Sequence, residues 1–137
     1  MKLDSSAFIA DPDLIKELEK QSTEICCGEG RVLFKQGDSP EGLFIIDQGE
    51  ITLTMDSPNG QNVMQVQAHP GSLLGLPGLI GNGPYTLSAI ARDGARVSFL
   101  PRDQFTAVMQ ANPQLSLKIL QVLAAELRTA RQALSNR

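Results

Sequence analysis

Few side chains in this 137-residue chain are of the types that bind metals or carry out redox chemistry. His69 is the single histidine, and Cys26 and Cys27 are the two cysteines. A metal site needs several such ligands, and a haem needs at least one dependable axial ligand. His69 lies at a predicted strand end before a turn, which favours a surface or capping role. Adjacent strand residues point to opposite faces, so we expect two reduced thiols, one buried and one partly exposed. We therefore predict no metal site, and a haem- or metal-binding sensor remains an alternative.

The chain also lacks the sequence patterns of common enzyme classes. It contains no G-x-S-x-G elbow, no phosphate-binding G-x-x-x-x-G-K loop and no H-E-x-x-H pair. The acids Glu41, Asp47 and Glu50 are expected to be solvated at turns or strand edges, and the glycines between 74 and 83 to provide backbone bends. We predict no catalytic residues, no enzyme activity and no resident cofactor.

Short apolar runs separated by Gly, Pro, Asp or Asn occupy the chain from about 24 to 100 and predict strands. Gly30, Gly37 and Gly49 stand between such runs, where a chain turns sharply between buried strands. Asn59-Gly60 predicts an exposed hairpin tip. The close strand spacing is typical of a sandwich or barrel. The predicted fold class is mainly β with flanking α: a double-stranded β-helix (jelly-roll) barrel with an N-terminal helix and C-terminal helices.

Helical patterns flank this predicted β-roll on both sides. Asp11-Pro12 is a typical helix start, and the apolar stripe that follows predicts a helix over about 13–20. After the roll, helices are predicted at about 102–111 and 113–135, because a proline at 113 interrupts the pattern. The apolar content of 42% suffices for one core, so residues 1–137 are expected to form a single domain.

The last predicted helix carries apolar residues at the spacing of a coiled-coil seam. The seam consists of Leu120, Leu123, Leu127, Ala130 and Leu134. In this register Glu126 and Arg131 take a g and the following e position, where two parallel helices can form an ion pair worth about 0–1 kcal/mol. We expect a homodimer through this helix; packing of the seam against the chain's own sheet is the alternative.

The overall charge and hydropathy exclude some partners. The net charge is −3 at pH 7 and the chain has no run of like charges, so direct DNA binding by this chain alone is not expected. No stretch reaches about 18 apolar residues, and acidic residues interrupt the N-terminal segment. We therefore expect no membrane segment, no export and a cytoplasmic location.

Two strings of residues carry a resemblance to a known family. They are Gly30-x-x-Leu33-Phe34-x-x-Gly37-Asp38 and Leu43-Phe44-x-Ile46-x-x-Gly49-x-Ile51-x-Leu53. They resemble the amino-terminal half of a cyclic-nucleotide-binding domain, and the order helix, roll, helix, helix is similar to the sensor half of the catabolite-activator / fumarate-nitrate-regulator family. Regulators of that family continue into a DNA-binding helix-turn-helix, which would not fit before Arg137. The output is therefore expected in a separate partner, or the chain is a fragment.

The same resemblance implies where a cyclic phosphate would bind: a Gly-Glu-hydrophobic turn, a short helix, and an Arg-Ser/Thr-Ala strand. The matching turn is Gly71-Ser72-Leu73, and the short helix is 76–80. Tyr85-Thr86-Leu87 takes the place of the strand residues, so tyrosine replaces the arginine. The two residues of the long helix that would reach the base correspond to Ala130-Arg131. Losing a charge-assisted arginine–phosphate hydrogen bond, worth about 1.5–3 kcal/mol, lowers affinity by about one to two decades.

These observations predict a non-catalytic regulatory or sensor module with a degenerate phosphate-binding cassette that signals through a dimerising C-terminal helix. The candidate ligand-binding residues are Gly71, Ser72, Leu73, Tyr85, Thr86 and Arg131. Besides a second copy, the expected partner is a small-molecule or nucleotide ligand. Tight cyclic-nucleotide binding is not expected, and a protein-interaction module without a ligand is the alternative. Tyr85 either fills the vacated phosphate pocket or lies outside it.

Overall fold

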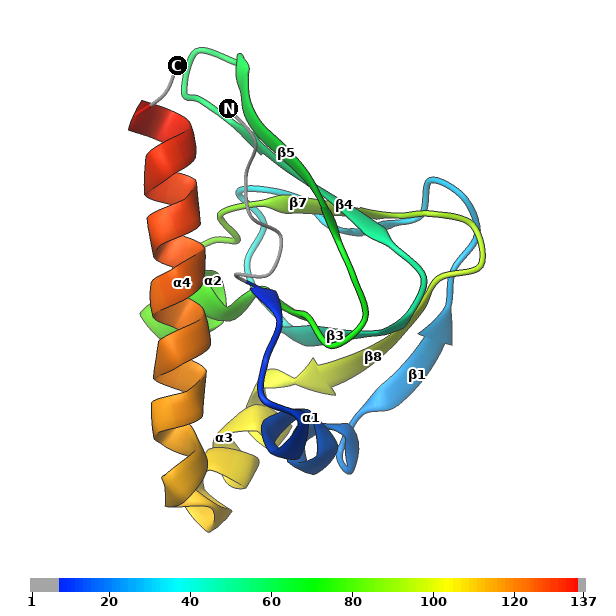
Figure 1. The fold of residues 1–137 in the computed structure, drawn as a ribbon, viewed down its shortest axis with the longest axis vertical. Coiled ribbons are helices and arrows are strands. Elements are labelled where there is room, and N and C mark those ends of the chain that lie inside the picture. Colours follow the sequence, from blue (N-terminus) through cyan, green and yellow to red (C-terminus); the bar gives the residue numbers. More distant parts are fainter. Residues whose placement is uncertain (1–7, 136–137) are drawn as a thin grey trace.

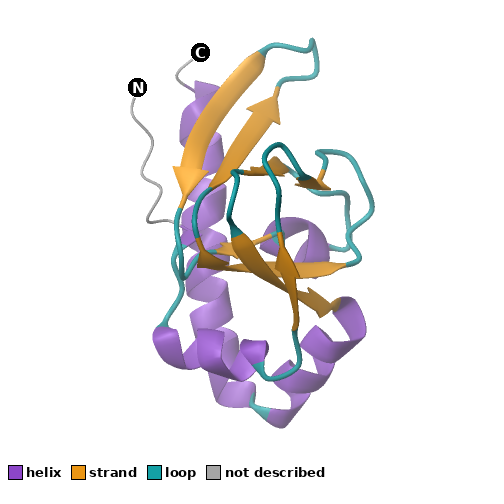
Figure 2. Ribbon diagram, turned by 90° about the vertical axis from the view of Figure 1, so that its right-hand side faces the viewer, coloured by secondary structure: helices purple, strands orange, loops and turns teal. Residues whose placement is uncertain are grey.

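A computed structural model of the chain describes residues 8–135, which form two four-stranded antiparallel sheets flanked by helices (Figures 1 and 2). The strands are β1 (Thr23–Cys26), β2 (Val32–Phe34), β3 (Gly42–Gln48), β4 (Ile51–Asp56), β5 (Asn62–Ala68), β6 (Leu73–Leu74), β7 (Ser88–Ala91) and β8 (Arg96–Pro101). One sheet has the order β1-β8-β3-β6 and the other β2-β7-β4-β5. This arrangement confirms the predicted jelly-roll fold class.

The helices cover one side and one end of the roll. They are α1 (Pro12–Glu19), α2 (Leu76–Gly81), α3 (Arg102–Ala111) and α4 (Ser116–Ser135), with a 3₁₀ turn at Pro113–Leu115 before α4. Figure 1 shows α1 and α3 beneath the β1-β8-β3-β6 sheet, while α4 runs along the whole height of the roll. No helix within residues 8–135 is long and apolar enough to cross a bilayer.

Strand β3 explains why helices cover the outer face of the β1-β8-β3-β6 sheet. Phe44 and Ile46 belong to the apolar core inside the roll, and the alternate residues Leu43 and Ile45 belong to a second core against the helices. Successive strand side chains point to opposite faces, so a strand that is apolar at every position must be covered on both. Strand β3, in the interior of the β1-β8-β3-β6 sheet, is therefore buried between the roll interior and the helices.

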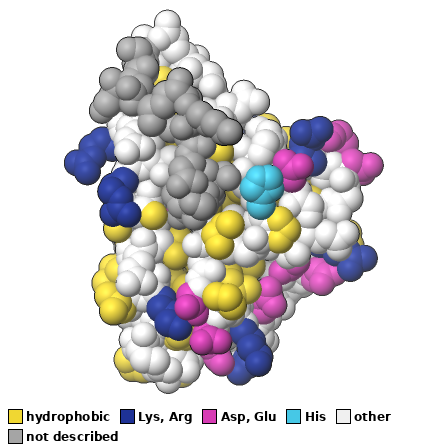
Figure 3. Space-filling model, viewed as in Figure 1, with side chains coloured by type: hydrophobic (Ala, Val, Ile, Leu, Met, Phe, Trp, Pro, Cys, Tyr) yellow, Lys and Arg dark blue, Asp and Glu magenta, His cyan; other side chains and the backbone are white. Residues whose placement is uncertain are grey.

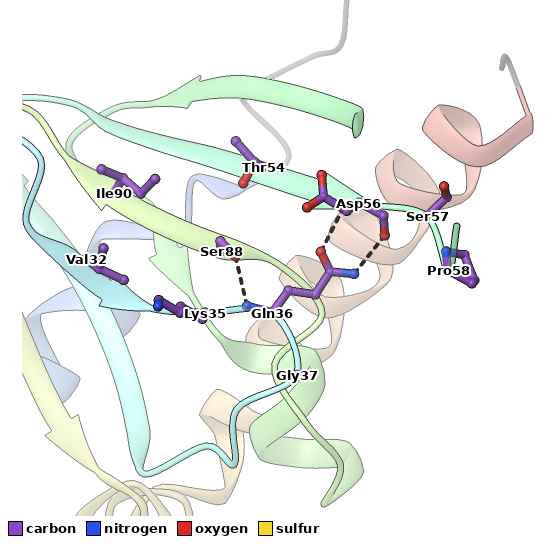
Figure 4. A pocket seen from close by; sticks show the side chains of 10 residues that line it. All are labelled: Val32, Lys35, Gln36, Gly37, Thr54, Asp56, Ser57, Pro58, Ser88 and Ile90. Atoms are coloured by element: carbon purple, nitrogen blue, oxygen red, sulfur yellow. Dashed lines mark hydrogen bonds between the residues drawn. The ribbon is translucent and has the colours of Figure 1, made fainter. Parts of the chain in front are cut away.

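The other sheet is covered on one face only. In β4, Ile51, Leu53 and Met55 are buried in the roll interior, while Thr52 and Thr54 are half-buried. The outer face forms an open hollow of about 620 Å³ (Figure 4). At its edge the Gln36 side chain donates to Asp56 O at 2.9 Å and accepts from Asp56 N at 2.8 Å, and Gln36 N donates to Ser88 Oγ. The polar groups here thus bond one another and tie the chain after β2 to the end of β4.

The first helix is fixed both by its own cap and by α4. Asp11 Oδ1 accepts hydrogen bonds from the backbone N–H groups of Asp13 at 2.9 Å and Leu14 at 3.4 Å, as an N-cap side chain does. Lys118 Nζ donates to the same Asp11 oxygen at 2.9 Å, and the hydrogen bond from Lys118 lowers the pKa of Asp11. The start of α4 is therefore tethered to the start of α1.

A pair of carboxyl groups lies where the end of α1 meets the sheet. Glu19 interacts with Asp47 of β3, and Ser98 Oγ of β8 donates to Asp47 Oδ2 at 2.5 Å. Burial, followed by the hydrogen bond and charge of Asp47, raises the pKa of Glu19 to about 6. Because the folded state holds this proton more tightly than the unfolded chain, its contribution to stability is present at low pH and is lost as the pH rises from about 4.5 through about 6.

Replacing Glu19 with Gln should therefore stabilise the fold at pH 7 and have little effect at pH 4. The gain should stay below about 1 kcal/mol, because Glu19 is exposed and water screens the repulsion. Urea unfolding of both proteins at the two pH values measures it. Glu17→Gln is the matched control, since Glu17 pairs with Lys20 at 2.9 Å; an equal gain at pH 7 in this control would contradict the assignment to the Glu19–Asp47 pair.

Candidate functional site

The candidate site is a cavity of about 460 Å³ between the roll and the upper half of α4. Met55 and Met64 from the β4–β5 hairpin form one wall, and Pro77 and Leu87 from the segments around α2 and β7 form another. The opposite wall includes Glu126 and Leu127 of α4. The cavity is largely apolar, which is typical of small-molecule sites in this size range.

Tyr85 forms part of the cavity wall and is fixed from several directions. Its hydroxyl donates to Gly42 O at 2.9 Å, and its ring stacks on Phe34 with centroids 4.2 Å apart. A Cβ added at Gly75 would stand 2.9 Å from Tyr85 Cε1. Only 4% of Tyr85 is exposed, and burial raises the pKa of its hydroxyl. Tyr85 is thus packed into the wall beside the cavity, where a neutral phenol stands at the position predicted for arginine.

The predicted turn Gly71-Ser72-Leu73 lies elsewhere. Ser72 and Leu73 are fully buried, and none of the three lines the cavity. Strand β6 separates this turn from α2, so the residues at the start of α2 are Gly75, Leu76 and Pro77. Gly75, with a φ of +98°, contacts Tyr85. The structure therefore does not bring Gly71, Ser72 and Leu73 together with Tyr85 and Thr86. The turn that lies beside Tyr85 is Gly75-Leu76.

The remaining predicted ligand residues divide between the two sides of α4. Thr86 is exposed and lines the cavity. Arg131 instead lines a groove on the outer face of α4, together with Ala124, Leu127 and Arg128. Ala130 lies outside the residues whose side chains the structure describes. The structure thus places Thr86, but not Arg131, at the cavity.

The charges at the cavity do not suit a phosphate. Among the described residues that line it there is no Lys, Arg or His, and its two ionisable acids are Asp56 and Glu126. A phosphate in such a site would lose its hydration without gaining a charge-assisted partner. Helix α2 is only six residues long, and the backbone N–H groups at its start would offer a phosphate a partial charge rather than a cation.

Glu126 is a site residue that the heptad pattern missed. It is only 4% exposed, and its Oε1 has no hydrogen-bond partner within the described part of the chain. Burial raises the pKa of its carboxyl well above the ordinary value. A g-position ion pair with Arg131 of a second helix is therefore wrong, because Glu126 faces the roll and Arg131 the outer groove. Glu126 follows the apolar Ile119 by seven residues, about two helical turns, and this spacing could have indicated that both lie on the same buried face of α4.

Helix α4 carries two stripes at helical spacing. Ile119, Val122 and Glu126 are buried against the rest of the chain. Leu117, Leu120, Ala124 and Leu127 are exposed. Of the predicted seam, Leu120 and Leu127 lie on this outer stripe, whereas Leu123 is half-buried and packs against the core beneath the helices. Leu134, like Ala130, is outside the residues with described side chains. Figure 3 shows hydrophobic side chains along the edge where α4 lies.

The residues considered for redox or metal chemistry are scattered. His69 is exposed after β5, Cys26 is exposed and Cys27 is buried. Burial raises the pKa of the Cys27 thiol, which disfavours the reactive thiolate. Within residues 8–135, no three His, Cys, Asp or Glu side chains are grouped so as to hold a metal ion.

Comparison with known proteins agrees with this architecture. Residues 26–112 match the family model of the cyclic nucleotide-binding domain. The chain is 26% identical over 126 residues to a CRP-like cAMP-activated global transcriptional regulator of Mycobacterium tuberculosis, covering 92% of this chain and 56% of that protein. It is 28% identical over 102 residues to the cyclic AMP receptor protein of Thermus thermophilus, covering 74% of this chain and 47% of that protein. The chain thus spans about half the length of these relatives.

Among solved structures, the catabolite activator protein of Thermus thermophilus superposes with a TM-score of 0.77 at 24% identity, covering 91% of this chain and 59% of that one. This likeness supports the fold. The family model covers well over half of the chain, including β2 to β8, α2 and α3. This chain therefore belongs to the cyclic nucleotide-binding domain family.

Proposed function

We propose that this chain is a non-catalytic regulatory module. Binding of a ligand in the cavity changes how α4 packs on the roll, and α4 passes this change to a second copy of the chain. The observation that carries the proposal is the position of α4: Leu127 lines both the cavity and the outer groove. A change in how α4 packs on the roll therefore alters both surfaces. Ligands act on such elements by favouring one of two packing arrangements.

The phosphate-binding cassette of this module is degenerate. Tyr85 stands in place of the arginine, and Leu76, which is fully buried, follows the glycine that precedes α2. Restoring charge from Arg131 would require this side chain to reach around α4 from the opposite groove. Cyclic nucleotides are therefore not the ligands of this cavity, despite the activity that the names of its relatives state.

The outer stripe of α4 is the proposed dimer interface. Leu117, Leu120 and Leu127 are 64%, 54% and 50% exposed, and together with Ala124 they follow the alternating three- and four-residue spacing of a coiled-coil seam. Leucines this exposed in a continuous line are favoured to become buried by association. The predicted homodimer is retained here with a seam that runs through Leu117 and Ala124 rather than Leu123.

The output of the module lies outside the described residues. Because the matched relatives are transcriptional regulators about twice as long, a DNA-binding part elsewhere, or a separate partner protein, would receive the signal in the cytoplasm. A protein-interaction module that no longer senses a ligand is the second candidate. The lack of Lys, Arg and His among the described lining residues of the cavity favours this candidate as much as the first.

Cyclic AMP or cyclic GMP at about 1 mM should not raise the melting temperature of this protein, because the described residues that line the cavity offer the phosphate no cation. The test is sensitive, since a ligand that binds only the folded state with a Kd near 10 μM would add about 2.7 kcal/mol of stability at this concentration. Differential scanning calorimetry measures the shift, and the cyclic AMP receptor protein of Thermus thermophilus is the positive control. Saturable stabilisation by either nucleotide would contradict the degenerate cassette.

Leu120→Glu should raise the dimer dissociation constant by at least about tenfold, because two charges would face each other in an apolar seam. Gln121→Glu adds the same charge to the neighbouring exposed position, off the stripe, and should leave the dimer intact. Sedimentation equilibrium on the three proteins measures the constants. A monomeric parent protein, or equal weakening by both variants, would refute the proposed interface.

A further inference from the structure

Helix α4 places an unpaired acid in a row of side chains that is otherwise suited to an apolar core. Leu115, Ile119 and Val122 are buried on the inner face, and the next position of this row is Glu126. Burial of a leucine side chain at this position would stabilise the fold, whereas an unpaired carboxyl group costs free energy when it is removed from water. Glu126 therefore weakens the fold unless something else binds its oxygen.

The groups around Glu126 do not supply that partner. Thr129, one turn further along α4, donates its hydroxyl hydrogen to Ala125 O at 3.0 Å. The Gln36 side chain at the other side of the cavity already forms two hydrogen bonds to the backbone of Asp56 (Figure 4). Tyr85 donates to Gly42 O. Thr86, the other hydroxyl side chain of the lining, is exposed. None of these groups bonds Glu126, whose Oε1 is left without a partner within the described residues.

We propose that the cavity between the roll and α4 binds a small, largely apolar molecule without negative charge, one hydrogen-bonding group of which pairs with Glu126. This inference rests on the proposed regulatory function and specifies its ligand class. The cavity volume of about 460 Å³ accommodates a molecule of two or three fused or linked rings. The methionines at 55 and 64 can adjust to irregular apolar shapes, because their side chains are unbranched and polarisable.

The charge of the ligand follows from the lining. Asp56 and Glu126 are the carboxyl groups among the described lining residues, which include no Lys, Arg or His, so a negative group would meet no attraction. The raised pKa of Glu126 favours its protonated form, and a protonated carboxyl can both donate and accept a hydrogen bond. A neutral ligand with an N–H or O–H group would therefore satisfy Glu126 without burying a net charge.

Three probes with one shared shape test the proposal. N-phenyl-1-naphthylamine is neutral and carries one N–H, 8-anilinonaphthalene-1-sulfonate adds a sulfonate to the same skeleton, and 1-benzylnaphthalene replaces the N–H with CH₂. Isothermal titration of the full chain should give saturable binding of the neutral amine. The sulfonate should bind at least about tenfold more weakly, because the cavity offers it no cation.

Two variants locate the binding and one controls for surface adsorption. Met64→Trp fills the cavity and should abolish binding of the amine. Glu126→Leu should weaken the amine about three- to tenfold, the value of one hydrogen bond, and leave 1-benzylnaphthalene unweakened. This second variant removes an unpaired carboxyl and is expected to fold at least as stably as the parent. Val32→Thr changes an exposed apolar side chain in the outer hollow and should have no effect.

Sulfonate binding as tight as that of the amine, or equal weakening of the amine and the hydrocarbon by Glu126→Leu, would overturn the proposal. So would unchanged amine binding in a folded Met64→Trp protein. Probe titration measures binding in the cavity, whereas sedimentation measures dimerisation, so the two results are independent. A monomeric chain that binds the probes as expected would therefore refute the proposed dimer signalling and support the ligand class.

Discussion

Strand β3 must be covered on both faces, and the remaining architecture depends on that constraint. Leu43 and Ile45 require helices below the sheet, and Phe44 and Ile46 require the second sheet above it. At Gly42 a Cβ would overlap the carbonyl oxygen of Leu100, so β3 and β8 approach closely at the end nearest the cavity. The same glycine supplies the carbonyl that accepts the Tyr85 hydrogen bond. The cavity wall is therefore anchored where β3 and β8 approach each other closely.

Local chemistry allowed much of this fold to be predicted from the sequence. Alternation in β4 and the Asp11 cap of α1 each reflect forces within a few residues, and the structure contains both. The cassette turn was misplaced because Gly71 and Gly75 both adopt positive φ, four residues apart. Sequence alone does not indicate which glycine precedes α2, since the two-residue strand β6 between them is too short to produce a pattern.

The two faces of α4 illustrate a second limit. Helical periodicity identifies apolar stripes, but it does not assign a stripe to the chain's own core or to a partner when both are rich in leucine. Leu123 packs inward while Leu120 is exposed, and only the tertiary fold distinguishes them. Glu126 was assigned to the outside because the heptad register placed it at a g position. A charged residue is rarely buried alone, so its burial departs from the local preference of its environment.

The family fold is retained, and we propose that the chemistry of its cavity has changed. Most of the roll, α2 and α3 lie in the segment that matches the family model, whereas the described lining of the cavity carries a phenol and aliphatic side chains and no Lys, Arg or His. Recognition depends on a few side chains grafted on a scaffold. A shared architecture therefore predicts where a ligand would lie better than it predicts the ligand's charge.

Tyr85 is the sole tyrosine of the chain, which contains no tryptophan. Its ring, stacked on Phe34 and hydrogen-bonded through its hydroxyl, therefore dominates the intrinsic ultraviolet emission of the protein and much of its near-ultraviolet dichroism. The only phenol of the chain thus lies at the wall of the cavity. Unlabelled protein thus carries its own optical reporter of that wall, free of background from other indole or phenol groups.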